Sequence, residues 1–176
     1  MNYYSPDEAL ALAVVDALKT RSETLAVCES LTAGMAAATL ASIPGASAVL
    51  RGGLITYATD LKVHLARVPQ EVIDTHTVVS TEVAEAMAIG AREQCGSDWG
   101  LSLTGVAGPT QQDGHPVGTV FLGIAFPNGT AHAFQLDARV LQGDRNTVRK
   151  AAVDLGLESL HSEIVKYQGI GIRMSK

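Results

Sequence analysis

Three polar residues, spaced ten and then five positions apart, could form a serine-based catalyst. Ser47 follows Pro44-Gly45, Tyr57 ends an apolar run, and Lys62 lies five positions further on. A serine hydroxyl is a poor nucleophile until a base takes its proton. A lysine can be that base when burial or neighbours lower its pKa, and Tyr57 could relay the proton or orient the lysine. The pattern allows Ser–Lys acyl-transfer chemistry, whereas a solvated Lys62 and a half-buried Tyr57 are the ordinary structural alternative.

Two further segments are suited to binding a phosphate-bearing ligand. "ESLTAG" (residues 29–34) and "TGVAGP" (residues 104–109) both place small, polar and glycine residues directly after an apolar run. Free N–H groups and hydroxyls at such a junction bind anions, and glycine lets the backbone approach a ligand closely. Helix capping and a tight strand-to-loop transition are the alternative explanations. The candidate ligand-contacting residues are Glu29, Ser30, Thr32, Gly34, Thr104, Gly105 and Gly108.

Arg145 is a further candidate for the ligand site. It follows Asp144 in "GDR", at the expected start of the last long helix. Asp144 can cap that helix. Arg145 is then either a surface charge or a phosphate ligand, for which the planar guanidinium is well shaped.

The other reactive side chains indicate neither a metal nor a cysteine nucleophile. Cys28 reads as an apolar strand residue, and the five histidines have no metal-ligand spacing. His115, within "DGHPVG", is in a glycine- and proline-rich loop, where packing or solvent contact is the simpler role. We therefore expect no metal and no cofactor.

The elements that must position these residues alternate between helix and strand. Apolar periodicity predicts helices at residues 5–22, 31–43, 60–68, 69–76, 78–96 and 143–166. Short apolar runs predict strands at residues 24–28, 52–58, 98–105, 119–126 and 130–137. Ser80 or Thr81 can cap the fifth helix and Gly96 can end it.

This order predicts an α/β fold: a three-layer α/β/α sandwich with a mixed, mostly parallel sheet of about five strands. Asn128-Gly129 predicts a hairpin, which requires at least one antiparallel strand. Ligands of open α/β sheets bind at the carboxyl ends of the strands. The expected site is therefore where the polar segments 29–34, 56–62 and 104–109 follow their strands.

The bulk composition is that of a single domain over residues 1–176, with residues 167–176 as a C-terminal tail. The net charge is −5, with a pI near 5.5 and no Lys/Arg cluster, which argues against nucleic acid and favours a small-molecule ligand. The chain has no apolar run of about 18 residues and no secretory leader pattern, so we expect no membrane association. Two distant cysteines form no disulfide framework, which indicates a cytoplasmic protein.

Six ordered blocks of the sequence resemble a known family. They are "CESLTAG", "PGASAVLRGGLITYATDLK", "VVSTEVAEAMAIGA", "SLTGVAGP", "HPVGTVFLGIA" and "GDRNTVRKAAV". Together they resemble the CinA C-terminal domain of competence/damage-inducible proteins, the nicotinamide mononucleotide (NMN) deamidase domain, over residues 7–165.

The resemblance implies an α/β/α sandwich that hydrolyses the carboxamide of NMN to nicotinate mononucleotide and ammonia, without a metal and commonly as a homodimer. The catalytic residues that it implies are Ser47, Tyr57 and Lys62, which match the family's residue types and spacing. Lys62, assisted by Tyr57, would deprotonate Ser47 for attack on the carboxamide carbon. The ribose phosphate would lie against "ESLTAG" or "TGVAGP".

The binding segments depart from the family pattern. Leu31 and Ala33 stand in a block that usually reads ESCTGG, Thr59 replaces the asparagine of TYSN, and His115 stands where a lysine is usual. A second hypothesis is therefore a pyridine-nucleotide-binding module without catalysis, with a regulatory or partner-binding role. RNA binding is a third, by analogy with anticodon-binding domains of this architecture, and the acidic charge argues against it.

Overall fold

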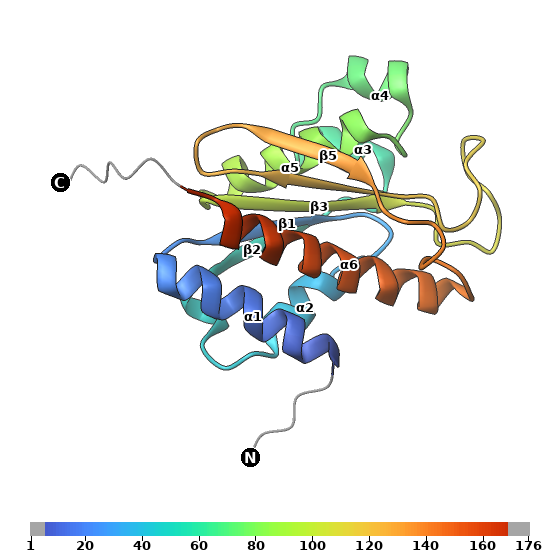
Figure 1. The fold of residues 1–176 in the computed structure, drawn as a ribbon. Helices are drawn as coiled ribbons and strands as arrows, with labels where there is room; N and C mark the ends of the chain where they lie inside the picture. The colour runs from blue at the N-terminus through green and yellow to red at the C-terminus, as the bar shows by residue number, and fades with distance from the viewer. Residues whose placement is uncertain (1–5, 169–176) are drawn as a thin grey trace.

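The computed structural model describes residues 6–168, built around one five-stranded sheet (Figure 1). The sheet has the order β2-β1-β3-β4-β5. Its strands are β1 (Leu25–Glu29), β2 (Leu50–Ile55), β3 (Trp99–Gly105), β4 (Val120–Ala125) and β5 (Ala131–Gln135). β1 is parallel to β2 and β3, whereas β4 is antiparallel to both of its neighbours, β3 and β5. Every strand except β4 therefore points the same way, and the prediction of a mixed sheet of about five strands is confirmed.

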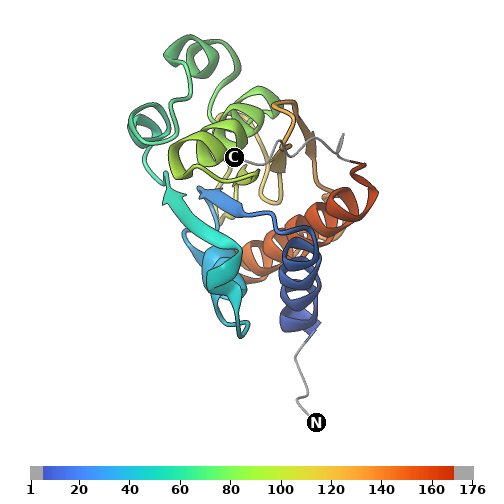
Figure 2. The ribbon, with the colours of Figure 1, turned by 90° about the vertical axis from the view of Figure 1, so that its left-hand side faces the viewer.

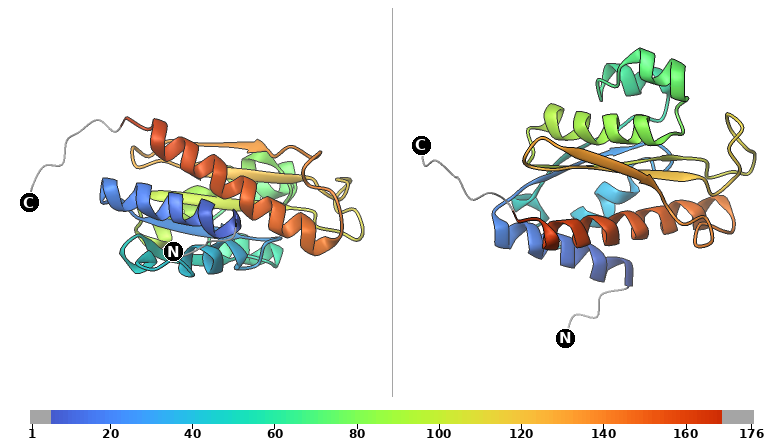
Figure 3. Two further views of the ribbon diagram at one scale, coloured as in Figure 1. Left: turned by 60° about the horizontal axis from the view of Figure 1, so that its bottom comes forward. Right: turned by 45° about the horizontal axis from the view of Figure 1, so that its top comes forward.

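Helices cover both faces of this sheet, as Figures 1 and 2 show. The helices are α1 (Pro6–Arg21), α2 (Met35–Ala41), α3 (Thr59–His64), α4 (Gln70–His76), α5 (Thr81–Cys95) and α6 (Arg145–Lys166). α1, α2 and α6 lie on one face, and α5 lies on the other with α3 and α4 on its side (Figure 3). The predicted three-layer α/β/α arrangement is confirmed.

The central strands β1 and β3 are buried along almost their whole length, which explains why they read as continuous apolar runs. On one face, Leu18 and Leu157 belong to the core beneath α1 and α6. On the other face, Cys28 and Met87 belong to the core beneath α5. The sheet is thus a rigid platform whose strand ends can position polar side chains.

Two glycines let α5 lie close to its neighbours. A Cβ atom at Gly100 of β3 would lie 2.0 Å from the carbonyl oxygen of Ala88, and one at Gly90 would lie 1.8 Å from that of Ala66. The predicted ends of the helix are also confirmed: Ser80 Oγ accepts from the N–H of Val83, and α5 ends at a left-handed Gly96. These features fix α5 against the sheet.

The second strand differs from its prediction, because it covers Leu50–Ile55 rather than residues 52–58. Thr56 N donates to Glu29 O at 2.9 Å, but the Thr56 carbonyl accepts from Lys62 Nζ instead of continuing the strand ladder. The chain turns here and enters α3 after Ala58. Tyr57 therefore belongs to a junction and not to a strand.

The predicted C-terminal tail, residues 167–176, is described only at its first two residues. The ring of Tyr167 packs edge-on against Trp99, with 5.2 Å between ring centroids, and the remainder of the tail lies outside the described residues. Among helices within residues 6–168, none has both the length and the apolar character that crossing a membrane requires.

Candidate active site

A polar pocket of about 280 Å³ lies where the carboxyl ends of β1, β2 and β3 meet. Each of the three polar segments that follow these strands contributes to it, and the first residue of α6 closes one side. The residues that line the pocket include Ser30, Leu31, Tyr57, Thr59, Lys62, Thr104, Gly105, Gly108 and Arg145. The pocket is thus at the edge where open α/β sheets bind ligands.

Lys62 is a buried basic residue of this pocket. It lies on α3 with 1% of its surface exposed, and its Nζ atom lies 2.8 Å from the carbonyl oxygen of Thr56 and 3.1 Å from Ser30 Oγ. Burial lowers the pKa of the Lys62 ammonium below 10.5, because the charged form loses its hydration. A neutral amine held at that distance can accept the proton of the Ser30 hydroxyl.

Ser30 is positioned directly by the sheet. It is the first residue after β1, and its N–H donates to the carbonyl oxygen of Leu103 at 2.9 Å. The serine–lysine pair therefore comes from two neighbouring parallel strands, and its geometry depends on the sheet rather than on a long loop. Burial raises the pKa of the adjacent Cys28 thiol to about 11, so that thiol stays protonated and is not a competing nucleophile.

The structure places Ser47 at the opposite edge of the sheet. Ser47 lies on a 3₁₀ turn, Ala46–Ala48, that precedes β2, whereas Lys62 follows the other end of that strand. The register pairs Leu25 with Leu50 and Glu29 with Ile55, so the whole strand separates the two side chains. A strand of six residues is about 20 Å long. The choice of Ser47 as nucleophile is therefore corrected: the serine next to Lys62 is Ser30.

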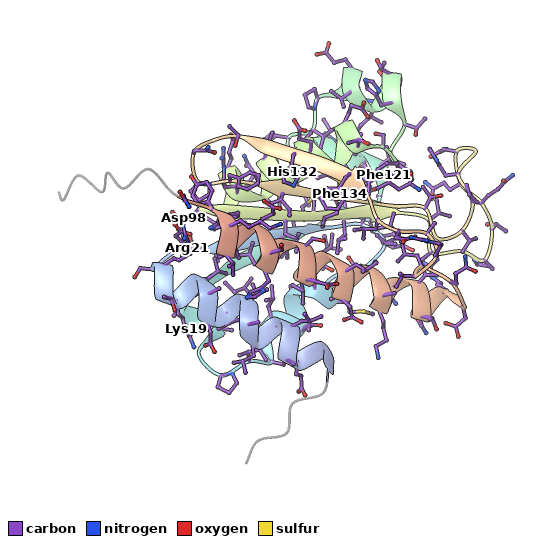
Figure 4. The ribbon with its side chains drawn as sticks, in the orientation of Figure 1. Lys19, Arg21, Asp98, Phe121, His132 and Phe134 are labelled. Atoms are coloured by element: carbon purple, nitrogen blue, oxygen red, sulfur yellow. The ribbon has the colours of Figure 1, made fainter. Side chains whose placement is uncertain are left out.

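Ser47 precedes β2 at the same edge of the sheet at which Asp98 precedes β3. Lys19, Arg21 and Asp98 gather there, on the side away from the start of α6 (Figure 4). Lys19 Nζ donates to the carbonyl oxygen of Pro44 at 3.3 Å in an exposed contact. Ser47 is therefore near a solvated surface and not near a buried base.

Tyr57 lines the pocket, but its partner is an arginine. Its ring is 56% exposed, and its phenolic oxygen accepts a hydrogen bond from Arg145 Nη2 at 2.6 Å. Arg145 Nη1 donates to the carbonyl oxygen of Gly108. Within residues 6–168, no hydrogen bond joins Tyr57 to Lys62. Tyr57 and Arg145 together form the exposed rim of the pocket.

The predicted ligand-contacting residues divide into two groups. Ser30, Thr104, Gly105, Gly108 and Arg145 line the pocket, whereas Glu29, Thr32 and Gly34 do not.

Glu29 has a structural role instead. Its buried carboxylate accepts from the backbone N–H groups of Gly34 and Ala36 at 3.0 Å and of Ala37 at 2.9 Å. Thr104 Oγ1 donates to the carbonyl oxygen of Val78, which ties β3 to the segment before α5. Glu29 thus fixes the start of α2 and with it the segment that carries Ser30.

Sequence reasoning missed Arg149. From α6 it donates through Nε to the carbonyl oxygen of Leu31 at 2.9 Å and through Nη2 to that of Thr32 at 3.0 Å. The signal in the sequence is its position four residues after Arg145, because residues i and i+4 share one face of a helix. Both arginines thus reach the same edge of the sheet.

The pocket has a serine and a lysine that could carry out acyl transfer. Among the side chains that the structure describes, no three His, Cys, Asp or Glu residues are grouped to hold a metal ion. Lys62 and Arg145 place basic side chains at two positions of the lining, and Val78, Val79 and Val106 add apolar wall between polar groups. Such a pocket suits a ligand with a ring, a polar reacting group and an anion.

The fold and this pocket define an α/β/α domain with a serine–lysine pair at the carboxyl edge of its parallel strands. A family model described as the CinA C-terminal domain matches residues 7–164. The chain belongs to this family.

Two curated relatives carry the name putative competence-damage inducible protein. One, from Listeria welshimeri, is 43% identical over 141 residues, which are 80% of this chain and 33% of the relative. Another, from Streptococcus pneumoniae, is 46% identical over 127 residues, which are 72% of this chain and 30% of the relative. This chain therefore spans about a third of the length of the curated relatives that it matches.

Solved structures of the same superfamily are similar over nearly the whole chain. A CinA superfamily protein from Klebsiella pneumoniae has a TM-score of 0.86 at 27% identity, covering 92% of this chain and 99% of that one. The competence/damage inducible protein CihA from Agrobacterium tumefaciens has a TM-score of 0.83 at 30% identity, covering 92% and 98%.

Proposed function

We propose that this chain is an amidohydrolase that converts NMN to nicotinate mononucleotide and ammonia, with Ser30 as nucleophile and Lys62 as base. The observation that carries the proposal is the 3.1 Å contact between Lys62 Nζ and Ser30 Oγ inside the pocket. Two features support it: burial lowers the lysine pKa, and the resemblance to the deamidase family implies a serine and this lysine. Ser–Lys pairs are an established variant of the acyl-transfer constellation.

In the first half of the proposed reaction, neutral Lys62 takes the proton of the Ser30 hydroxyl as Oγ bonds to the carboxamide carbon. The carbonyl electrons move to oxygen and then return as the C–N bond breaks. The Lys62 ammonium gives its proton to the leaving nitrogen, which departs as ammonia. The ring of NMN is a pyridinium, whose electron deficiency makes the carboxamide more reactive.

In the second half, water resolves the acyl-enzyme ester. Lys62, neutral again, takes a proton from water as the hydroxide oxygen bonds to the acyl carbon. The bond to Ser30 Oγ then breaks, and the serine recovers a proton from Lys62. The product leaves as a carboxylate.

We propose that Arg145 binds the phosphate of the substrate. Its guanidinium lies at the rim of the pocket, and its partners there, the Tyr57 phenol and the Gly108 carbonyl, are uncharged. Charge-assisted bonds to a phosphate are stronger than bonds to neutral acceptors. The phosphate would replace Tyr57 as the acceptor for Nη2. A pocket of about 280 Å³ is at the small end for ligand sites and favours a mononucleotide over a dinucleotide.

The test is ammonia release from NMN by the wild type, Ser30→Ala and Ser47→Ala. We expect Ser30→Ala to lose at least about 10³-fold in kcat, and Ser47→Ala to keep wild-type activity. The reverse order would restore Ser47 as the nucleophile. A wild type that binds NMN and releases no ammonia would contradict the proposal and support the non-catalytic binding module instead.

A further inference from the structure

The turn that follows Ser30 is fixed through its carbonyl oxygens. Ala33 N donates to Ser30 O at 3.1 Å, Arg149 Nε donates to Leu31 O at 2.9 Å, and Arg149 Nη2 donates to Thr32 O at 3.0 Å. A trans peptide unit is planar, so its C=O and N–H groups point in opposite directions. These bonds therefore also fix the directions of the N–H groups of Leu31 and Thr32.

Those two N–H groups have no partner of their own. Within residues 6–168, no hydrogen bond is assigned to the backbone nitrogen of Leu31 or of Thr32, and the buried Thr32 hydroxyl also has none. Both residues are buried, at 4% and 0% exposure. Buried N–H groups in proteins are nearly always paired. Because Leu31 lines the pocket, its unpaired N–H, directly after Ser30, indicates a place for an oxygen that arrives with the substrate.

Several neighbouring donors are already occupied. The N–H groups of Gly34, Ala36 and Ala37 donate to the Glu29 carboxylate, and Val106 N donates to the carbonyl oxygen of Thr119. These N–H groups are therefore not available to a substrate oxygen. Leu31 lines the pocket, and its N–H belongs to the peptide bond that it shares with Ser30.

We propose that the N–H group of Leu31, which lines the pocket, is a donor of the oxyanion hole of the Ser30 site, and that Arg149 is the residue that positions the turn that carries it. This inference rests on the proposed amide hydrolysis. When Ser30 Oγ bonds to the carboxamide carbon, negative charge develops on the carbonyl oxygen, and the Leu31 N–H stabilises it. Arg149 does not line the pocket and touches only the carbonyl side of the turn. Its bond to the Leu31 carbonyl oxygen fixes the orientation of Leu31 and with it the direction of the Leu31 N–H.

The first experiment compares kcat and KM for NMN in three variants. We expect Arg149→Ala to lower kcat about 100-fold, as loss of an oxyanion donor does, with KM changed by less than about threefold because ground-state binding is kept. Arg149→Lys keeps one charged donor and is expected to lose less. The matched control is Arg139→Ala, which removes an exposed arginine paired with Asp137 and is expected to change neither constant.

The second experiment uses a fluorophosphonate, which reacts at the serine without needing NMN. Ser30 Oγ bonds to phosphorus, fluoride leaves, Lys62 takes the serine proton, and the phosphoryl oxygen occupies the oxyanion position. The rate of labelling at Ser30 should fall in Arg149→Ala by a factor similar to that for kcat. Guanidinium ion at millimolar concentration should restore part of it, and should restore nothing in Ser30→Ala.

The outcomes separate this inference from the proposed function. Arg149-dependent labelling of Ser30 without ammonia release from NMN would overturn the substrate and support the oxyanion hole. An unchanged kcat and labelling rate in Arg149→Ala, or a loss confined to KM, would overturn the oxyanion hole. The oxyanion hole would also be overturned if both Arg149 variants lost helical circular dichroism in proportion to their losses in kcat and labelling rate, and if guanidinium restored neither rate. A wild type that is not labelled at Ser30 would overturn both.

Discussion

Ser30 and Ser47 lie at the two ends of the same pair of parallel strands, and their surroundings differ in every respect that matters for catalysis. Ser30 follows β1 and lies 3.1 Å from a buried lysine. Ser47 precedes β2 on an exposed turn, and the lysine at that edge of the sheet, Lys19, is in an exposed contact with Pro44. The difference shows that the fold, and not the spacing along the chain, decides which serine lies beside the buried lysine.

The largest expected effect on kcat comes from replacing Lys62 by methionine, compared with the same replacement at Lys19. Lys62→Met keeps the length and apolar stem but removes the base, so kcat for ammonia release should fall at least about 10³-fold. Lys19→Met is the matched change at the Ser47 edge and should leave kcat within about twofold, as expected for a surface group outside the site. Steady-state kinetics of both variants checks this. A large loss in Lys19→Met alone would reverse the comparison of the two edges.

The pH dependence tests whether burial of Lys62 sets its reactivity. The base must be neutral, so kcat/KM should rise about tenfold per pH unit below the pKa of Lys62. Because burial lowers that pKa, the plateau should begin below pH 10.5. A pH–rate profile measures it, and a rise that continues to pH 10.5 would mean that Lys62 is not desolvated in solution.

The same pKa difference has a consequence for stability. The unfolded chain binds the lysine proton more readily than the folded chain between the lowered pKa and 10.5. The free energy of unfolding of the wild type, relative to Lys62→Met, should therefore decrease as pH falls through that window and become constant below it. Urea unfolding at several pH values measures this difference, and a pH-independent difference would contradict it.

A smaller effect is expected at the rim of the pocket. Arg145→Ala should raise KM for NMN about tenfold or more, because a charge-assisted bond to phosphate is lost. KM for nicotinamide riboside, which lacks the phosphate, should be nearly unchanged. Equal increases in KM for the two substrates would show that Arg145 acts through Tyr57 or Gly108 and not through the phosphate.

The smallest effect distinguishes two roles for Tyr57. If the phenol serves only as a partner of Arg145, Tyr57→Phe should change kcat/KM about threefold, the usual value for one neutral hydrogen bond. If it assists Lys62 in the reaction, as the family resemblance implies, for example by relaying a proton, kcat should fall about 100-fold or more. Kinetics of this single variant decides between the two roles.

Much of the fold was predictable because residues close together in the sequence determine the helices, strands, turns and caps. Alternating apolar helices and strands, the Asn128-Gly129 hairpin and the caps at Ser80 and Asp144 follow from residue types at short range, and the structure has them. The three junctions after β1, β2 and β3 were also predictable, since parallel strands bring their carboxyl ends to one edge.

It was less predictable which side chains of the site contact one another. The sequence predicts Lys62 at the correct edge of the sheet. It predicts Ser47 as the serine beside Lys62, although a predicted strand lies between Ser47 and Tyr57, whereas the structure has Ser30 there. Extended chain of that length separates its ends by about 20 Å. Arg149 was missed because its partners are backbone carbonyl oxygens more than 100 positions away, at Leu31 and Thr32, which no local pattern reveals.

The two arginines of α6 also determine when the site is completed during synthesis. Ser30 and Lys62 leave the ribosome early, whereas Arg145 and Arg149, which hold the rim and the turn beside Ser30, belong to the last helix that the structure describes. Domains generally fold as units once their chain is available. A nascent chain that ends before α6 would thus contain the serine and the lysine without the contacts that hold their loops.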